Sequence, residues 1–152
     1  MADSEEPAEP VGEEAAAEAA AAAASSGSGA FKYPDGASYE GEWSTSADGA
    51  VQRNGQGTFV SATGDRYSGG WVNDAMEGQG TLTYSGGAVY AGEWKANAYA
   101  GAGKYSWADG SAYDGAWQAN KMNGQGTYTD SSSENWEGAF FNGNGAGLLL
   151  TQ

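Results

Sequence analysis

The chain has 152 residues, of which 26 are glycine, and it carries a formal net charge of −14. It contains no cysteine and no histidine, which excludes disulfides, thiolate nucleophiles, imidazole bases and Cys/His zinc sites. So much glycine with such a charge is typical of disorder, but 6 Trp, 9 Tyr and 4 Phe are not. The order of the residues must therefore decide the fold class.

Residues 1–26 differ in composition from the rest of the chain. They hold seven acidic residues, no basic residue and no aromatic residue. The segment from Glu13 to Ala24 consists of strong helix formers, but a helix of Ala and Glu has no apolar face to bury. We expect an acidic tail that is disordered or transiently helical; the alternative is a helix that docks on a basic partner.

The ends and the apolar runs of the chain bear on its compartment. The first residues lack the basic and leucine-rich regions of a secretory signal, and no run approaches the ~20 apolar residues of a membrane span. The acidic charge argues against nucleic acid and against anionic membranes as partners. We therefore expect a cytoplasmic or cytoskeletal protein whose partners have a basic surface.

From residue 27 on, two glycine-containing strings alternate. The first is Tyr-x-Gly-x-Trp, with a degenerate last copy, and its copies start 28, 23, 23 and 23 residues apart. They begin at Tyr39, Tyr67, Tyr90, Tyr113 and Trp136. The second is Gly-x-Gly, followed in most copies two residues later by an aromatic residue or leucine. Its copies begin at Gly27, Gly55, Gly78, Gly101, Gly124 and Gly145.

Two departures from the 23-residue period are confined to one position of the repeat. Five extra residues lie between Trp43 and Gly55, and the last copy is interpreted as losing two residues between Phe140 and Gly145. Length changes that occur at a single position identify that position as a loop.

Period-2 alternation predicts that each string is a β-strand and that each repeat is a hairpin. Asp74, Asn97 and Asn120 follow the tryptophans by three residues and suit left-handed turn geometry. A glycine between two large aromatics leaves room for a ring to lie against the backbone. We predict an all-β fold, an elongated single-layer antiparallel β-meander of eleven strands over residues 27–152. It comprises a half repeat at 27–38 and repeats starting at 39, 67, 90, 113 and 136.

The pattern Tyr-x-Gly-x-Trp, Gly-x-Gly-x-Tyr and Asp-Gly at 23 residues resembles the MORN repeat. Residues 109–117 are most similar to the family consensus. The resemblance implies a curved, elongated antiparallel sheet used for scaffolding or protein binding. Many stand-alone MORN proteins belong to ciliary and flagellar axonemes, including radial-spoke heads, or to membrane junctions and cytoskeletal assemblies. Some members have been proposed to bind phosphoinositides.

Candidate catalytic groups are weak in this sequence. Glu40 and Glu42 flank Gly41, but no such carboxylate pair recurs in the other repeats. The segment 101–104 lacks the first glycine and the Ser/Thr of a phosphate-binding loop, and Asp109 lacks the further acids of a calcium loop. We expect no enzyme activity, no cofactor and no bound metal.

Aromatic and methionine side chains are the candidate binding residues. The strand tryptophans would form either the core of the sheet or the floor of a groove. Met76, Tyr99 and Met122 share one predicted loop position, five residues after Trp, and suit an adaptable rim. We hypothesise that this surface binds an apolar helix or peptide of a partner protein. The predicted contact residues are Trp71, Met76, Tyr84, Trp94, Tyr99, Trp107, Trp117 and Met122.

The last predicted strand adds a second candidate site, because Leu148, Leu149 and Leu150 form an apolar edge that another protein or a second copy would cover. Two functions remain open. The first is a non-enzymatic scaffold in a cytoskeletal assembly, most plausibly an axonemal complex such as a radial spoke. The second is a membrane-associated phosphoinositide-binding module. Membrane lipids are the less favoured partner, because the 6 basic residues are scattered along the chain.

Overall fold

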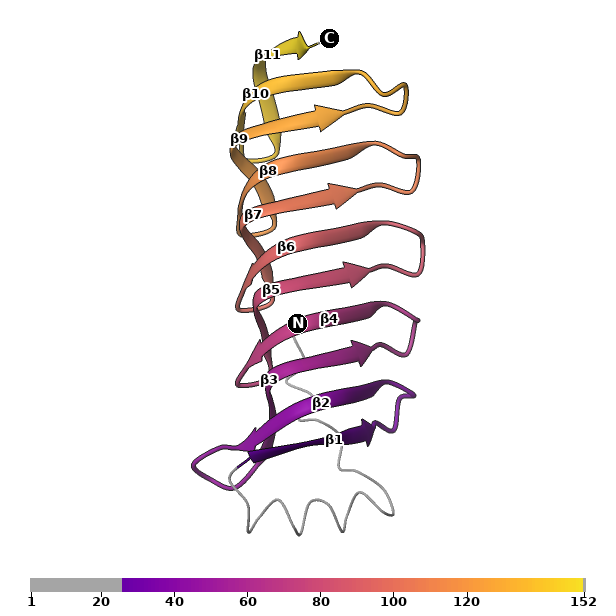
Figure 1. Cartoon of the computed structure of the whole chain (residues 1–152), viewed down its shortest axis with the longest axis vertical. Helices are drawn as coiled ribbons and strands as arrows, with labels where there is room; N and C mark the ends of the chain where they lie inside the picture. Colours follow the sequence, from indigo (N-terminus) through magenta and orange to yellow (C-terminus); the bar gives the residue numbers. More distant parts are fainter. Residues whose placement is uncertain (1–25, 152) are drawn as a thin grey trace.

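The computed structural model describes residues 26–151, which form one open sheet of antiparallel strands in chain order (Figure 1). This confirms the predicted all-β meander, and the expectation for the acidic tail lies outside the described residues apart from Ser26. The strands are β1 (Ser26–Lys32), β2 (Ser38–Thr45), β3 (Val51–Val60), β4 (Arg66–Val72), β5 (Ala75–Thr83), β6 (Val89–Lys95), β7 (Ala98–Ser106), β8 (Ala112–Gln118), β9 (Lys121–Thr129), β10 (Asn135–Phe141) and β11 (Asn144–Thr151).

Glycine faces glycine across every neighbouring strand pair from β1 to β10. In β4 and β5, Gly69 lies opposite Gly80, and the register then shifts before Trp71, which lies opposite Met76. Two additional residues are thereby accommodated on β5, and the same irregularity follows the paired glycines in β2–β3, β6–β7 and β8–β9. Such bulges bend strands, and in Figure 1 the strands curl at the edge that carries the short turns.

Two kinds of turn alternate along the sheet. On one edge, five-residue turns such as 107–111 are closed by a backbone bond, here from the Trp107 N–H to the Ser111 carbonyl oxygen at 2.8 Å. On the other edge, two-residue turns have positive φ at both central residues, as at Asn73 (47°) and Asp74 (68°), which is the type I′ geometry that suits a twisted hairpin. The five extra residues lie in the β2–β3 hairpin, where the loop 46–50 is three residues longer than the two-residue turns and each strand is one residue longer. This loop projects at the lower left of Figure 1.

Two of the type I′ turns hold alanine in a left-handed conformation. Ala96 has φ 46° and Ala119 has φ 48°, whereas the equivalent residues of the other turns are Asn73 and Asn142. Because a Cβ disfavours this region and asparagine tolerates it, the double variant Ala96→Asn/Ala119→Asn is expected to be more stable by about 1 kcal/mol. Urea unfolding of both proteins measures the difference; an unchanged or lower midpoint would contradict the assigned turn geometry.

The last repeat corrects the interpretation that two residues are lost between Phe140 and Gly145. Its hairpin keeps the ordinary two-residue turn, and Gly145 lies opposite Phe140, where Met76 lies opposite Trp71. Gly147, seven residues after Phe140, has the positive φ (64°) of the first glycine in the other Gly-x-Gly strands. The loop is therefore of normal length. The bulge of β11 holds one extra residue, where the other bulges hold two, so the missing residue is in the bulge. As a result, Leu148 lies beside Gly138.

A candidate interaction surface beside an aromatic ladder

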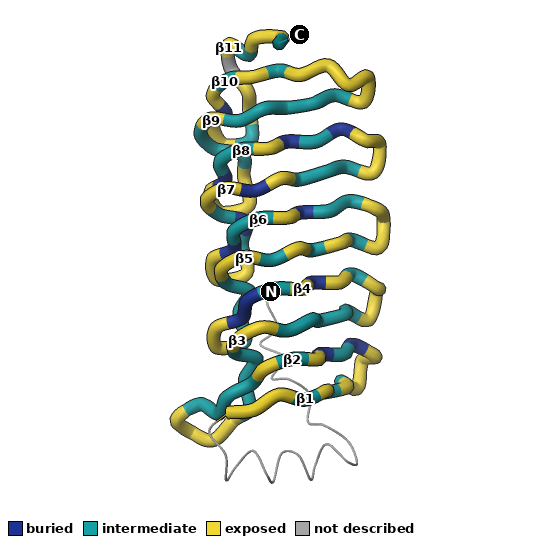
Figure 2. The backbone as a smooth tube through the Cα atoms, viewed as in Figure 1, coloured by how far each residue is buried: buried dark blue, intermediate teal, exposed yellow. Residues whose placement is uncertain are grey.

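Eight buried rings form a continuous ladder through the repeats. Adjacent rings meet edge to face, with centroids 4.7–5.6 Å apart, so that each internal tyrosine contacts the tryptophan of its own strand and the Trp or Phe of the next repeat. Figure 2 shows buried positions recurring along the length of the sheet. In order, the rings of the ladder are Tyr39, Trp71, Tyr67, Trp94, Tyr90, Trp117, Tyr113 and Phe140.

Backbone carbonyls next to the glycines satisfy the polar ends of these rings. The Trp94 indole N–H donates to the carbonyl oxygen of Gly80, on the last strand of the preceding hairpin, at 3.1 Å. Trp71 and Trp117 make the same bond to Gly57 and Gly103. The Tyr90 hydroxyl donates to the Glu93 carbonyl oxygen at 2.8 Å, three residues ahead, as the other ladder tyrosines do. The ring that lies over the paired glycines therefore belongs to the same hairpin and is fixed by its hydroxyl group.

Burial raises the pKa of the ladder tyrosines, with a smaller contribution from nearby carboxylates. The pKa of Tyr67 and that of Tyr90 rise from 10.0 to about 12. Since the folded protein holds the neutral phenol more firmly than the unfolded chain does, this stabilisation is complete below pH ~10 and is lost as the pH rises through about 12. We expect cooperative alkaline unfolding in that window, seen as coincident tyrosinate absorbance and circular dichroism changes. Independent tyrosine titration near pH ~10 with the sheet intact would contradict it.

The predicted contact residues Trp71, Trp94 and Trp117 all belong to the ladder and are buried, with exposed fractions of 4%, 4% and 7%. They serve as core of the sheet, which was one of the two roles open to them, and a partner would reach little of each ring. These tryptophans are buried because the strand register places each one against the tyrosine of the preceding repeat, whose ring covers it.

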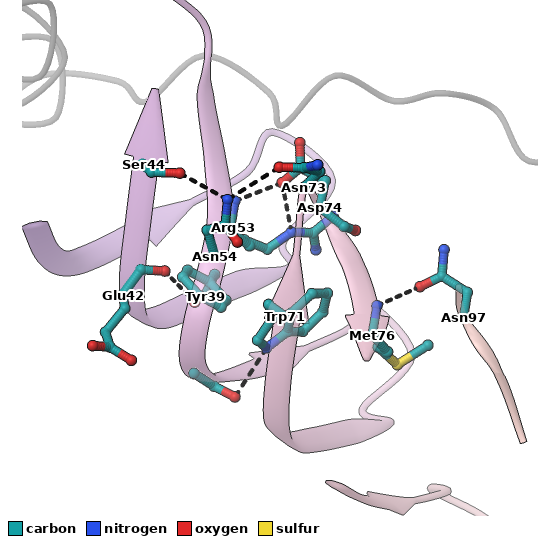
Figure 3. Close-up of polar contacts among 11 residues, drawn as sticks. Tyr39, Glu42, Ser44, Arg53, Asn54, Trp71, Asn73, Asp74, Met76 and Asn97 are labelled. Carbon is teal, nitrogen blue, oxygen red and sulfur yellow. Dashed lines mark hydrogen bonds and ion pairs between the residues drawn. The ribbon is translucent and has the colours of Figure 1, made fainter. Parts of the chain in front are cut away.

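Met76, Tyr99 and Met122 do share one structural position, but it lies in strands β5, β7 and β9 and not in a loop. The next turn is bonded to this position: the Met76 N–H donates to Asn97 Oδ1 at 2.8 Å (Figure 3), and the Tyr99 N–H donates to Asn120 Oδ1 at 2.8 Å. The tyrosine at this position is also no flexible rim residue. Tyr99 is 8% exposed and stacks on Tyr90, with centroids 4.0 Å apart.

The same position is occupied by Arg53 near the N-terminal end of the sheet. Arg53 pairs with Asp74 across the hairpin boundary, Nε to Oδ1 at 3.1 Å (Figure 3). Its guanidinium lies over the rings of Phe59 and Trp71, at 5.1 and 4.5 Å from the ring centroids. This guanidinium covers the aromatic face there. Further along, the hydroxyls of Tyr84 and Tyr99 hydrogen-bond to each other and join the two sides of that face.

An open groove follows the Tyr84–Tyr99 bond. Its volume is about 320 Å³. Its lining includes Tyr105, Trp107, Trp117, Lys121, Met122, Asn142 and Gly143. Of the predicted contact residues, Met76, Tyr84, Trp107 and Met122 are partly buried and thus reach the surface. The structure therefore groups Trp107 and Met122 at one groove and leaves Met76 outside it.

The three leucines of β11 separate by side. Leu148 packs against the core cluster, while Leu149 is 71% exposed and Leu150 is 46% exposed. Within residues 26–151, β11 pairs only with β10. Phe141, 77% exposed and at the turn end of β10, is a surface residue that the sequence analysis missed; its position directly after the final ladder ring was the available signal.

The carboxylates of Glu42 and Glu93 have structural partners. Glu42 Oε2 accepts the Gln56 N–H at 2.5 Å, and Glu93 Oε2 accepts the Ala102 N–H. Each thereby satisfies an amide in a bulge. Among residues 26–151, no group of three or more His, Cys, Asp or Glu is placed to hold a metal ion, and no helix long and apolar enough to span a membrane is found.

A single curved sheet of tandem hairpins, held by an internal ring ladder and open to solvent along its length, defines a repeat protein of the binding type. The profile of the MORN repeat matches residues 52–66, 67–89, 90–112 and 113–133, which together make up more than half of the chain. The chain belongs to the MORN-repeat family, whose repeats are non-catalytic and generally mediate interactions with proteins or membranes. No curated protein matches the chain in a sequence comparison.

Proposed function

We propose that this protein is a non-enzymatic scaffold that binds other proteins in a cytoskeletal assembly, and that this assembly is a ciliary or flagellar axoneme complex of the radial-spoke type. The observation that carries the scaffold role is the open groove beside Trp107, an apolar surface that the internal packing leaves accessible. The axonemal placement draws on the family resemblance, which is an analogy at the level of the repeat.

Charge favours a protein partner over an anionic membrane. Residues 27–152 hold 13 acidic and 6 basic residues, and the six basic residues lie on six different strands. One of them, Arg53, is paired with Asp74. A headgroup site needs several cations in one place, and the six are distributed along the whole sheet. Flotation with phosphoinositide-containing liposomes is expected to leave the protein unbound.

Proximity labelling with the full-length chain in ciliated cells tests the placement. Enrichment of axonemal proteins over cytosolic ones is the expected outcome, and a Trp107→Ala/Met122→Ala variant that still folds is expected to lose part of this enrichment. Equal labelling of cytosolic proteins, or recovery with membranes together with liposome binding, would overturn the proposal in favour of the lipid-binding alternative.

A further inference from the structure

We propose that a proline-rich segment in the polyproline II conformation binds across Tyr105, Trp107 and Tyr128, here called the aromatic triad. This inference specifies a partner chemistry for the proposed scaffold and rests on that function. The triad lies at the edge of the groove: the rings of Tyr105 and Trp107 are 4.8 Å apart between centroids, and those of Trp107 and Tyr128 are 6.0 Å apart. The three rings are in contact and form one continuous aromatic surface.

The triad presents hydrogen-bond donors that have no acceptor among residues 26–151. The ladder tryptophans Trp71, Trp94 and Trp117 all donate their indole N–H to a glycine carbonyl, but the Trp107 indole N–H makes no such bond in this part of the chain. The hydroxyls of Tyr105 and Tyr128 also lack a partner within residues 26–151. Because no buried polar side-chain atom in that part of the chain is unsatisfied, these three donors reach solvent.

A polyproline II helix offers the matching acceptors. It has no internal hydrogen bonds, so its carbonyl groups are free to accept from indole and phenol donors, and its rings pack in crevices between aromatic side chains. Apolar residues between the prolines would enter the groove that Tyr105 and Trp107 line. Three donors, an aromatic surface and the adjoining groove are thus met by one ligand conformation.

The spacing of the repeats also fits this conformation. Tyr105 and Tyr128 occupy the same position in successive repeats, two strands apart, which corresponds to ~9.6 Å along the sheet. A polyproline II helix advances ~9.3 Å in each three-residue turn. An α-helix that presents one face every seven residues advances ~10.5 Å in that interval, so it departs from the ~9.6 Å spacing of the repeats sooner than a polyproline II helix does.

Charge complementarity indicates that basic residues flank the prolines. Asp109 lies two residues after Trp107, and Asp130 lies two residues after Tyr128. Hydrogen bonds from Ser111 to Asp109, and from Glu134 and Ser132 to Asp130, lower the pKa of both carboxyl groups, so that they stay ionised. Lys121 also lines the groove, so the basic flanks of the ligand are expected to lie toward the two aspartates and away from this lysine.

Fluorescence anisotropy of the full-length chain with labelled peptides tests the inference. The probe repeats the triplet Pro-Pro-Leu and carries lysines at both ends. Saturable binding is expected, with at least tenfold weaker binding of a peptide of equal charge in which serine replaces proline. A peptide that repeats Pro-Pro-Leu-Leu should also bind more weakly, because its period no longer matches the repeat.

Variants localise the contact. Trp107→Phe keeps a ring and removes the N–H, so affinity is expected to fall about fivefold, the effect of one neutral hydrogen bond. Trp43→Phe is the matched control and should leave affinity unchanged, because Trp43 lies on β2 and its indole N–H likewise has no acceptor among the described residues. Circular dichroism verifies that both variants fold.

Three results would overturn the inference: equal binding of the serine peptide, tighter binding of an amphipathic helical lysine–leucine peptide, or unchanged affinity of folded Trp107→Phe. Axonemal labelling of the chain in cells, without binding of the proline peptide, refutes this ligand and leaves the scaffold function standing. Binding of the peptide without axonemal labelling refutes the placement alone.

Discussion

Replacing Gly92 with valine is expected to destabilise the protein by ~3 kcal/mol or more, or to prevent folding. A Cβ at this position would overlap the Cα of Gly103 and lie 2.6 Å from the Ala102 carbonyl oxygen and 3.0 Å from the Tyr90 hydroxyl. Two of these neighbours are backbone atoms of the paired strand, so no rotamer change relieves the overlap. Urea unfolding followed by circular dichroism measures the effect.

Gly86 provides the control for this substitution. It lies in the 84–88 turn, has an ordinary φ, and an added Cβ would meet no atom within 4 Å. Gly86→Ala is therefore expected to change stability by less than ~0.5 kcal/mol. If Gly92→Val and Gly86→Ala proved equally mild, the close packing of glycine against glycine across β6 and β7 would be wrong.

Trp94→Ala is the second substitution with a large expected effect, a loss of ~3–5 kcal/mol. The indole contacts the rings of Tyr67, Tyr90 and Tyr99, at centroid distances of 5.2, 5.1 and 4.9 Å, and it donates to the Gly80 carbonyl oxygen. Its removal leaves a cavity between two repeats and interrupts the ladder near its middle. Since each repeat contacts its neighbours, amide exchange should accelerate first on both sides of β6.

Trp94→Phe and Trp107→Ala separate the causes of that loss. Phenylalanine keeps a ring and removes the hydrogen bond, so ~1 kcal/mol is expected, and the chain already has Phe140 at the last position of the ladder. Trp107 lies outside the ladder and is only partly buried, so its truncation should cost less than that of Trp94. Equal effects of the two alanine variants would contradict the ladder as the main core.

Much of the fold could be predicted from the sequence because two short patterns, Tyr-x-Gly-x-Trp and Gly-x-Gly, recur with the same period. Gly27 and Gly29, which resemble linker by composition, lie opposite Trp43 and Gly41 on β2, as their phase indicated. The last repeat could not be assigned correctly, because Gly145 and Gly147 imitate the Gly-x-Gly string while the backbone uses Gly147 as the bulge residue. The Gly-x-Gly string alone does not show which of its glycines adopts the positive φ.

The candidate site was harder to predict than the fold. Alternation places Tyr99 and Met122 at one position, but it does not show that Tyr99 stacks on Tyr90 while Met122 borders an open groove. That difference depends on hydroxyl bonds such as Tyr84 to Tyr99, which join residues fifteen apart in the chain. The structural role of Glu93 depends likewise on a bulge, which has no signature in the period-2 pattern.

The turn of each hairpin is bonded to the hairpin before it, as in the bonds from Asn97 to Met76 and from Asn120 to Tyr99. These bonds fix the step between repeats independently of what lies at either end of the sheet. Each 23-residue repeat therefore adds an increment of ~10 Å, two strand spacings, to the distance between groups bound at different places along it. A sheet built in this way sets the distance between groups bound at its two ends. Deleting residues 67–89 would shorten that distance by one increment and preserve both end surfaces.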